Sequence, residues 1–250
     1  MLGRIPATTW LRQLRSATDP GTVLVCFPPG GGSIGAFREL AREFDSGTAV
    51  FAVQYPGRQD RLDDLPLPGL AATAERVTAD LLTWPPVRFA LFGHSMGATI
   101  AYETARLLEA RGRTVTTLFA SGRIAPDAPY DGDLHRGTDA GLIDELARLA
   151  DDPASVEILR TEPALAELVL PAVRSDYQAV ETYVHRPGEP LRCTISVLLG
   201  EDDPTVTTEQ AQRWRAHTTG EFELTTFPGG HFYLDTRPAE VARLITARVG

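Results

Sequence analysis

The chain has 250 residues, 43% hydrophobic and 23% charged, which is enough to bury the core of a large α/β domain without a disulfide or a metal. Its formal net charge of -9 argues against nucleic acid as a partner. All 24 basic residues are arginine, which excludes a P-loop and a Schiff-base enzyme, because both need a lysine.

We expect no targeting signal in this sequence. Residues 1–15 lack the continuous apolar stretch of a signal peptide, and no apolar run approaches the about 20 residues that cross a membrane. Cys26 and Cys193 lie in apolar runs and are interpreted as core residues. We expect a cytoplasmic monomer that binds neither nucleic acid nor membrane.

Short apolar runs alternate with helical patterns along the chain. The patterns predict strands at 22–27, 48–55, 88–94, 114–122, 193–200 and 221–227, and helices at 33–44, 69–83, 97–111, 207–217 and from about 238. The strands lack polar alternation, as strands buried on both faces do. This order predicts an α/β fold, with a mainly parallel sheet flanked by helices and a site at the carboxyl ends of the strands.

Residues 123–190 interrupt this alternation. A crossover needs only about 10–12 residues, whereas this interval contains helical patterns at 139–150, 154–160 and 163–184. We expect a single domain over 1–250, in which 123–190 is a helical insertion over the sheet edge that carries the site. Additional packing without a role at the site is the alternative.

Gly93, Ser95 and Gly97 form a G-x-S-x-G motif between a predicted strand and a predicted helix. In that context the motif is typical of a sharp turn that exposes the serine Oγ and strains its backbone. The flanking positions leave room only for glycine. The motif therefore predicts Ser95 as a nucleophile, and a structural turn serine is the alternative.

A serine hydroxyl needs a base to become a nucleophile, and the base needs an acid to orient it. His231 follows the last predicted strand on a Pro-Gly-Gly turn and is the candidate base. Glu201, Asp202 and Asp203 follow the preceding strand, and the residues alone do not choose among them. The order serine, acid, histidine is that of α/β-hydrolases.

The loop "FPPGGGSIG" has two possible uses. The oxyanion of acyl transfer needs backbone donors, which we expect from Met96 and from Gly30, the first residue after the two prolines with an N–H; Gly31 is next. Gly30, Gly32 and Gly35 also spell a dinucleotide-binding fingerprint. Dinucleotide binding is a remote alternative, because the second strand ends without the acidic residue that holds a ribose.

Seven motifs together carry a family resemblance: "WLR" (10–12), "VCFPPGGGS", "YPGRQDR" (55–61), "FGHSMGA", "ASGRIAP", "LLGEDDP" and "FPGGHFYL". With them the chain resembles the stand-alone type II thioesterases of nonribosomal peptide and polyketide biosynthesis, over nearly its whole length. The resemblance implies an α/β-hydrolase fold with a helical lid. It also implies hydrolysis of acyl groups from the phosphopantetheine thiol of carrier proteins, which removes aberrant or stalled chains.

The resemblance also implies roles for residues. It assigns the nucleophile to Ser95, the base to His231 and the acid to Asp203, with Asp127 as an alternative acid position, and it implies no cofactor or metal. The "PPGGGS" loop departs from the usual family version, so the second oxyanion donor stays open between Gly30 and Gly31.

Other functions and the carrier contact also remain as expectations. A small-ester carboxylesterase or lipase and a discrete chain-releasing thioesterase are the alternatives. Releasing enzymes are usually fused to a synthetase, whereas this chain starts with its own Met and shows no carrier domain. We expect arginines of the insertion, among them Arg148, Arg160 and Arg174, to contact an acidic carrier.

Overall fold

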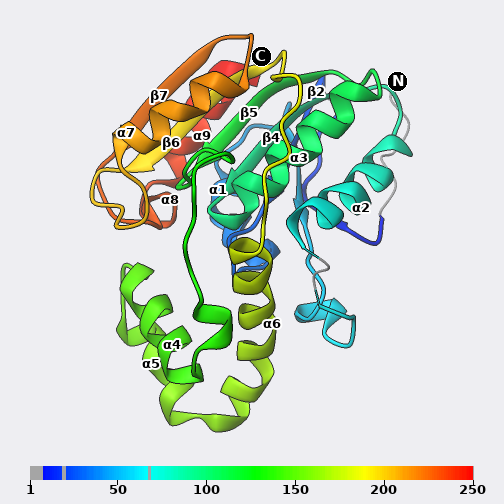
Figure 1. Cartoon of the computed structure of the whole chain (residues 1–250). Helices are drawn as coiled ribbons and strands as arrows, with labels where there is room; N and C mark the ends of the chain where they lie inside the picture. Colours follow the sequence, from blue (N-terminus) through cyan, green and yellow to red (C-terminus); the bar gives the residue numbers. More distant parts are fainter. Residues whose placement is uncertain (1–7, 19–20, 67–68, 250) are drawn as a thin grey trace.

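One mixed sheet of seven strands forms the centre of the computed structural model, which describes residues 8–18, 21–66 and 69–249 (Figure 1). The strand order is β1-β3-β2-β4-β5-β6-β7, and only β1 runs antiparallel to its neighbour. The strands are β1 (Leu11–Arg15), β2 (Thr22–Phe27), β3 (Ala49–Val53), β4 (Arg88–His94), β5 (Val115–Ser121), β6 (Thr194–Gly200) and β7 (Phe222–Phe227).

The six predicted strands are confirmed, but β1 was not predicted. Its sequence, "LRQLR", carries polar residues at three of its positions, and Leu11 is its one fully buried residue. A short edge strand buries little side-chain surface, so it lacks the apolar run that identifies an inner strand. The structure identifies β1 as a strand by its antiparallel pairing with β3, which its sequence does not indicate.

Helices cover both faces of the sheet. One face packs against α2 (Leu70–Leu82) and α3 (Met96–Ala110), and the other against α1 (Arg38–Arg42) and α9 (Pro238–Val249). Alternate residues of β2 enter the two cores, with Val23 and Val25 on one side and Leu24 and Cys26 on the other. This explains why the inner strands are apolar without alternation.

Two predicted helices are broken into tighter turns. The segment 33–44 begins as a 3₁₀ helix, η1 (Ile34–Phe37), before α1, and 207–217 divides into α7 (Thr208–Gln212) and η4 (Arg213–His217). Three further short helices, η2 (Gln59–Arg61), η3 (Leu134–Arg136) and α8 (Tyr233–Thr236), were not predicted. Three or four residues are too few for a helical periodicity to be visible in sequence.

The order of the strands determines where a site can form. From β2 the chain goes outward to β3 and then returns across β2 to β4, so β2 and β4 are neighbours whose following connections diverge. Such a switch point opens a crevice at the carboxyl ends of the strands. The glycine loop after β2 and the serine motif after β4 therefore lie beside one another.

The insertion between β5 and β6 is helical, as predicted. It contains η3 (Leu134–Arg136), α4 (Asp139–Leu149), α5 (Ala154–Thr161) and α6 (Pro163–Glu181), which gather beyond one end of the sheet in Figure 1. Leu142, Ile143, Leu159, Leu170 and Val173 form a small core of their own there. Its action as a lid remains a prediction.

Both cysteines are buried free thiols, as predicted, and burial raises the pKa of each, that of Cys193 to about 12. None of the helices in the described ranges is long and apolar enough to span a membrane. Residues 1–7, 19–20, 67–68 and 250 of the predicted domain lie outside the described part. The prediction about the N-terminus concerns residues 1–7 among them and is not addressed by the structure.

Candidate active site

Ser95 lies in the sharp turn between β4 and α3. Its backbone has φ 52° and ψ -120°, and Gln59 is the other non-glycine residue with positive φ in the described ranges. The Ser95 N–H donates to the Ser121 carbonyl oxygen (2.8 Å), and the Ala98 N–H donates to the Ser95 carbonyl oxygen (2.9 Å). These bonds hold a left-handed conformation that costs a non-glycine residue about 1–3 kcal/mol. The strained turn predicted from the motif is thus present.

The two flanking glycines are sterically required. A Cβ on Gly93 would overlap the backbone of Gly97, and a Cβ on Gly97 would overlap the carbonyl group of Phe27 at the end of β2. Backbone atoms of packed elements cannot move aside as a flexible side chain can. The close approach of α3 to the end of β2 therefore depends on glycine at position 97.

We expect Gly97→Ala to destabilise the protein by about 4 kcal/mol or more, because the overlap displaces either β2 or α3. The free energy of unfolding in urea measures this effect. Gly141→Ala is the matched control, since a Cβ there would meet its nearest atom, Thr138 Oγ1, at an ordinary 3.6 Å. This control is expected to stabilise by about 0.5–1 kcal/mol. Equal stability of the two variants would contradict the steric account.

His231 and Asp203 form a buried pair. His231 Nδ1 lies 2.8 Å from Asp203 Oδ2, and the two side chains are 1% and 0% exposed. The Thr205 N–H (2.8 Å) and hydroxyl (2.7 Å) both donate to Asp203 Oδ1. The carboxylate thus accepts from Nδ1–H, which leaves His231 Nε2 as the proton acceptor.

The charge of Asp203 is stabilised by these contacts. Burial alone would raise the pKa of its carboxyl, but the hydrogen bonds and charge of His231 and the two bonds from Thr205 bring that pKa below its usual value. Glu201 and Asp202 are both exposed. The structure therefore distinguishes Asp203 from its two neighbours, which the residues alone did not.

One cavity of about 70 Å³ brings together Ser95, Met96, Gly30 and His231. The fifth predicted site residue, Asp203, does not line this cavity but is hydrogen-bonded to His231, which does. A serine beside a histidine–aspartate pair, with backbone N–H groups nearby, is the arrangement that performs acyl transfer. Across the described ranges, no three His, Cys, Asp or Glu side chains form a group that could hold a metal ion. The individual catalytic roles remain predictions.

The loop after β2 favours Gly30 over Gly31 as a backbone donor. The Gly31 N–H already donates to Asp176 Oδ2 at 2.8 Å, whereas Gly30 lines the cavity with Ser95. The Gly31 N–H, engaged by Asp176, is also not free to bind the pyrophosphate that the dinucleotide alternative requires of this loop. That loop continues into the 3₁₀ turn η1 rather than directly into an α-helix.

A second buried serine and histidine lie next to the site. His94 Nδ1 is 2.9 Å from Ser121 Oγ, which is 2.6 Å from the Tyr233 hydroxyl, and the His94 and His231 rings are 4.8 Å apart. Burial and the neighbouring His231 lower the pKa of His94 well below its usual value. The low pKa and the contacts of His94 fit a packing role, and its lack of a catalytic role stays a prediction.

Asp127, the alternative acid position, belongs to a different pair. Its Oδ1 lies 3.0 Å from His217 Nε2, and Arg213 Nη2 lies 3.0 Å from its Oδ2. The other His217 nitrogen is 3.1 Å from the Tyr102 hydroxyl. Neither Asp127 nor His217 lines the cavity that contains Ser95. The geometry therefore favours Asp203 as the partner of His231.

Sequence reasoning missed Thr205, Arg58 and Asp176. Thr205 stands two residues after Asp203, the spacing at which an aspartate side chain commonly accepts a backbone N–H. Arg58 lies in the "YPGRQDR" motif, which contributes to the family resemblance but by itself indicates no contact for this side chain. Asp176 carries no comparable signal, because an aspartate in a helix is usually a solvated surface residue.

Three arginines expected to contact a carrier are already paired. Arg148 bonds Glu145 (2.7 Å), Arg174 bonds Asp139 (2.6 Å), and Arg160 bonds Asp144 and Glu157. Each partner lies in the insertion, so the local positive charge is largely balanced. A carrier contact through these side chains stays a prediction.

Comparison with known sequences identifies related proteins. The sequence model described as "Thioesterase domain" matches residues 22–249. The chain is 43% identical over 232 residues to a Streptomyces griseus protein named "Probable cadicidin biosynthesis thioesterase", covering 91% of this chain and 62% of that protein. It is 40% identical over 239 residues to Thioesterase PikA5 of Streptomyces venezuelae, covering 95% of this chain and 84% of the relative.

Solved structures of type II thioesterases also resemble this chain over nearly its whole length. The type II thioesterase BorB of the borrelidin cluster superimposes with a TM-score of 0.89 at 38% identity, covering 98% of this chain and 99% of BorB. YbtT, a type II thioesterase of the yersiniabactin pathway, gives a TM-score of 0.87 at 30% identity, covering 96% and 98% of the two chains. The predicted α/β-hydrolase fold is confirmed.

Proposed function

Because this chain belongs to the thioesterase family, we propose that it hydrolyses acyl thioesters on the phosphopantetheine arm of carrier proteins. The carriers would be those of a nonribosomal peptide or polyketide synthase, from which it removes aberrant or stalled acyl groups. The named relatives of biosynthetic pathways support this assignment. The observation that carries it is the His231–Asp203 pair beside the cavity that also contains Ser95.

The mechanism begins with Ser95. His231 Nε2 takes the hydroxyl proton as Oγ attacks the thioester carbonyl, and the N–H groups of Met96 and Gly30 bind the oxyanion. The C–S bond then breaks, and His231 gives its proton to the departing thiolate sulfur; a thiol pKa of about 8.5 makes this a good leaving group. A water molecule activated by His231 next hydrolyses the acyl-serine. Asp203 keeps the imidazole in the tautomer that accepts the serine proton.

The insertion would supply the acyl-binding surface and act as a lid. Leu146, Leu149, Tyr177 and Val180 line the inner cavity, whose small volume favours a short acyl group. A second, mainly apolar cavity of about 350 Å³ shares Gly30 and Leu146 with it, and also reaches α5. This outer cavity would take the pantetheine arm.

A panel of carrier proteins loaded with acyl groups of two to twelve carbons tests this function. Intact-protein mass spectrometry is expected to show rapid loss of short acyl groups, with slower loss of long ones. Ser95→Ala is the control for spontaneous hydrolysis. Free-ester hydrolysis that outpaces every loaded carrier would favour the small-ester alternative, and a cyclised product would favour chain release.

A further inference from the structure

A buried ion pair connects the insertion to the sheet. Arg58 follows β3, and Asp176 lies on α6, 118 residues later. Arg58 Nη1 donates to Asp176 Oδ2 (2.7 Å) and Nη2 donates to Oδ1 (2.8 Å), and the side chains are 10% and 0% exposed. Such a two-bond contact constrains both the distance and the orientation of the two groups.

The same pair also holds the glycine loop after β2. Asp176 Oδ2 accepts the Gly31 N–H (2.8 Å), and Arg58 Nη1 donates to the Gly32 carbonyl oxygen (2.9 Å). The loop is therefore bound on both sides of Gly31, directly beside Gly30. Gly31 has φ 71°, and a Cβ there would lie 3.3 Å from Val173 on α6, so helix and loop are closely packed.

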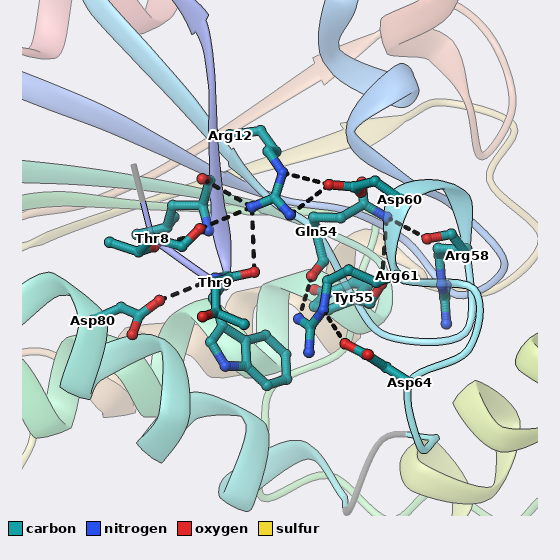
Figure 2. Close-up of polar contacts among 12 residues, drawn as sticks. Thr8, Thr9, Arg12, Gln54, Tyr55, Arg58, Asp60, Arg61, Asp64 and Asp80 are labelled. Atoms are coloured by element: carbon teal, nitrogen blue, oxygen red, sulfur yellow. Dashed lines mark hydrogen bonds and ion pairs between the residues drawn. The ribbon is translucent and has the colours of Figure 1, made fainter. Parts of the chain in front are cut away.

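Contacts with residues at the sheet edge hold the Arg58 segment in position. Figure 2 shows Gln54 Nε2 donating to the Arg58 carbonyl oxygen (3.2 Å) and Arg61 donating to the Gln54 carbonyl oxygen (2.8 Å). Arg12 on β1 pairs with Asp60 on the other side of this segment, and Arg61 with Asp64. The position of Arg58 thus follows from the sheet, whereas Asp176 reaches the loop only while α6 lies against it.

Stability does not explain this pair well. Two charges taken out of water lose solvation that their attraction often fails to repay, so hydrophobic replacements are commonly as stable. What a buried two-bond pair does provide is a defined geometry. In this protein it defines the geometry of the loop that contributes Gly30 to the cavity.

We propose that Arg58 and Asp176 are positioning residues that hold the Gly30 N–H where it binds the oxyanion, and that they make this donor depend on the docking of α6. The inference rests on the proposed function only for the roles of Ser95 and Gly30, and not for the identity of the substrate. Asp176 lines the cavity that contains Ser95, but both its carboxylate oxygens are bonded to Arg58 and one also to the Gly31 N–H, so its assigned role is to position the loop and not to contact the reacting atoms.

The test separates transition-state binding from ground-state binding. For Asp176→Asn and Arg58→Gln we expect kcat for p-nitrophenyl acetate to fall about 100-fold with KM changed less than about threefold, as misplacement of a catalytic group by about 1 Å produces. Butylboronic acid should bind more weakly by a similar factor, because Ser95 Oγ adds to boron, His231 takes the proton, and the charged tetrahedral adduct needs the same donor. S-butyl pantetheine, which stays uncharged, should keep its affinity.

Asp144→Asn is the matched control, because it breaks an exposed arginine–carboxylate pair with Arg160 in the insertion, which takes no part in the contacts that hold Arg58 or the glycine loop. It should retain the parent kcat and boronate affinity. A single change in the buried pair can also unfold the protein, so the double variant Arg58→Met/Asp176→Leu is tested alongside. We expect its Tm to return towards that of the parent while the loss of kcat persists.

Two outcomes would overturn the inference. Activity that recovers together with Tm in the double variant would make the pair purely structural. Equal losses of affinity for butylboronic acid and S-butyl pantetheine would place the effect on general binding rather than on the oxyanion. Since neither probe involves a carrier protein, inactivity towards acyl carriers would refute the proposed function and leave this inference standing.

Discussion

Ser95→Ala is expected to lower kcat for thioester hydrolysis by about 10⁴-fold or more, to the level of binding and oxyanion stabilisation alone. The physical reason is that no acyl-enzyme can form without the Oγ atom. The measurement is acyl release from a loaded carrier, together with the Tm of the variant. The protein should remain folded, since α3 and β4 keep their packing when one oxygen atom is removed.

Ser121→Ala is the informative control for this experiment. Ser121 is a fully buried serine next to the site, and its hydroxyl bonds His94 and Tyr233. Its loss should cost stability and leave activity within about tenfold. A fluorophosphonate probe should label the parent and Ser121→Ala at Ser95, and Ser95→Ala not at all. Activity of Ser95→Ala within tenfold of the parent would refute the nucleophile assignment.

Asp203→Asn is expected to lower kcat by about 10⁴-fold, because an amide donates to His231 Nδ1 and forces the proton onto Nε2. That tautomer cannot accept the Ser95 proton. Asp127→Asn should change activity hardly at all, since its partners are His217 and Arg213. Parallel measurement of kcat for the two variants checks the assignment, and the reverse result would move the acid to Asp127.

The free energies of unfolding of the parent and of Asp203→Asn, measured against pH, give an independent control. The pKa of Asp203 lies below its unfolded value of about 3.9, so its charge stabilises the fold above that pH and the contribution is lost as pH falls through the lower folded pKa. The difference in stability between the parent and Asp203→Asn should therefore shrink as pH falls below about 4. A difference that grows on acidification would contradict the assigned direction.

Local patterns were sufficient for much of the fold. The run "RFALFGH" predicts β4 with the observed bounds, because a strand buried on both faces must be apolar throughout its length. The motif around Ser95 predicts its strained turn, because only glycine fits beside it. The missed strand β1 marks the limit, since half-exposed edge residues carry no such constraint.

Chain order also indicated that a serine, an acid and a histidine each follow a strand of the sheet, here β4, β6 and β7, and that they meet because strand ends of a parallel sheet lie at one edge. It left Glu201, Asp202 and Asp203 equivalent. The choice needed the tertiary structure, in which one of three consecutive carboxylates turns inward to His231 and Thr205 while the other two face solvent. The orientation of a side chain at a turn depends on the residues that pack against the turn from elsewhere in the chain, and a local sequence pattern does not predict it.

The sequence by itself determined six of the seven strands, the longer helices, their order and the residue types suited to acyl transfer, because these follow from short-range burial and backbone sterics. Only the tertiary structure decided that Asp203 rather than Asp127 meets His231, and that Gly31 is occupied by Asp176 while Gly30 faces the cavity. The pair of Arg58 and Asp176 joins residues 118 apart. Their meeting depends on how α6 packs against the loop after β2, and such long-range packing leaves no periodic trace in the sequence around either residue.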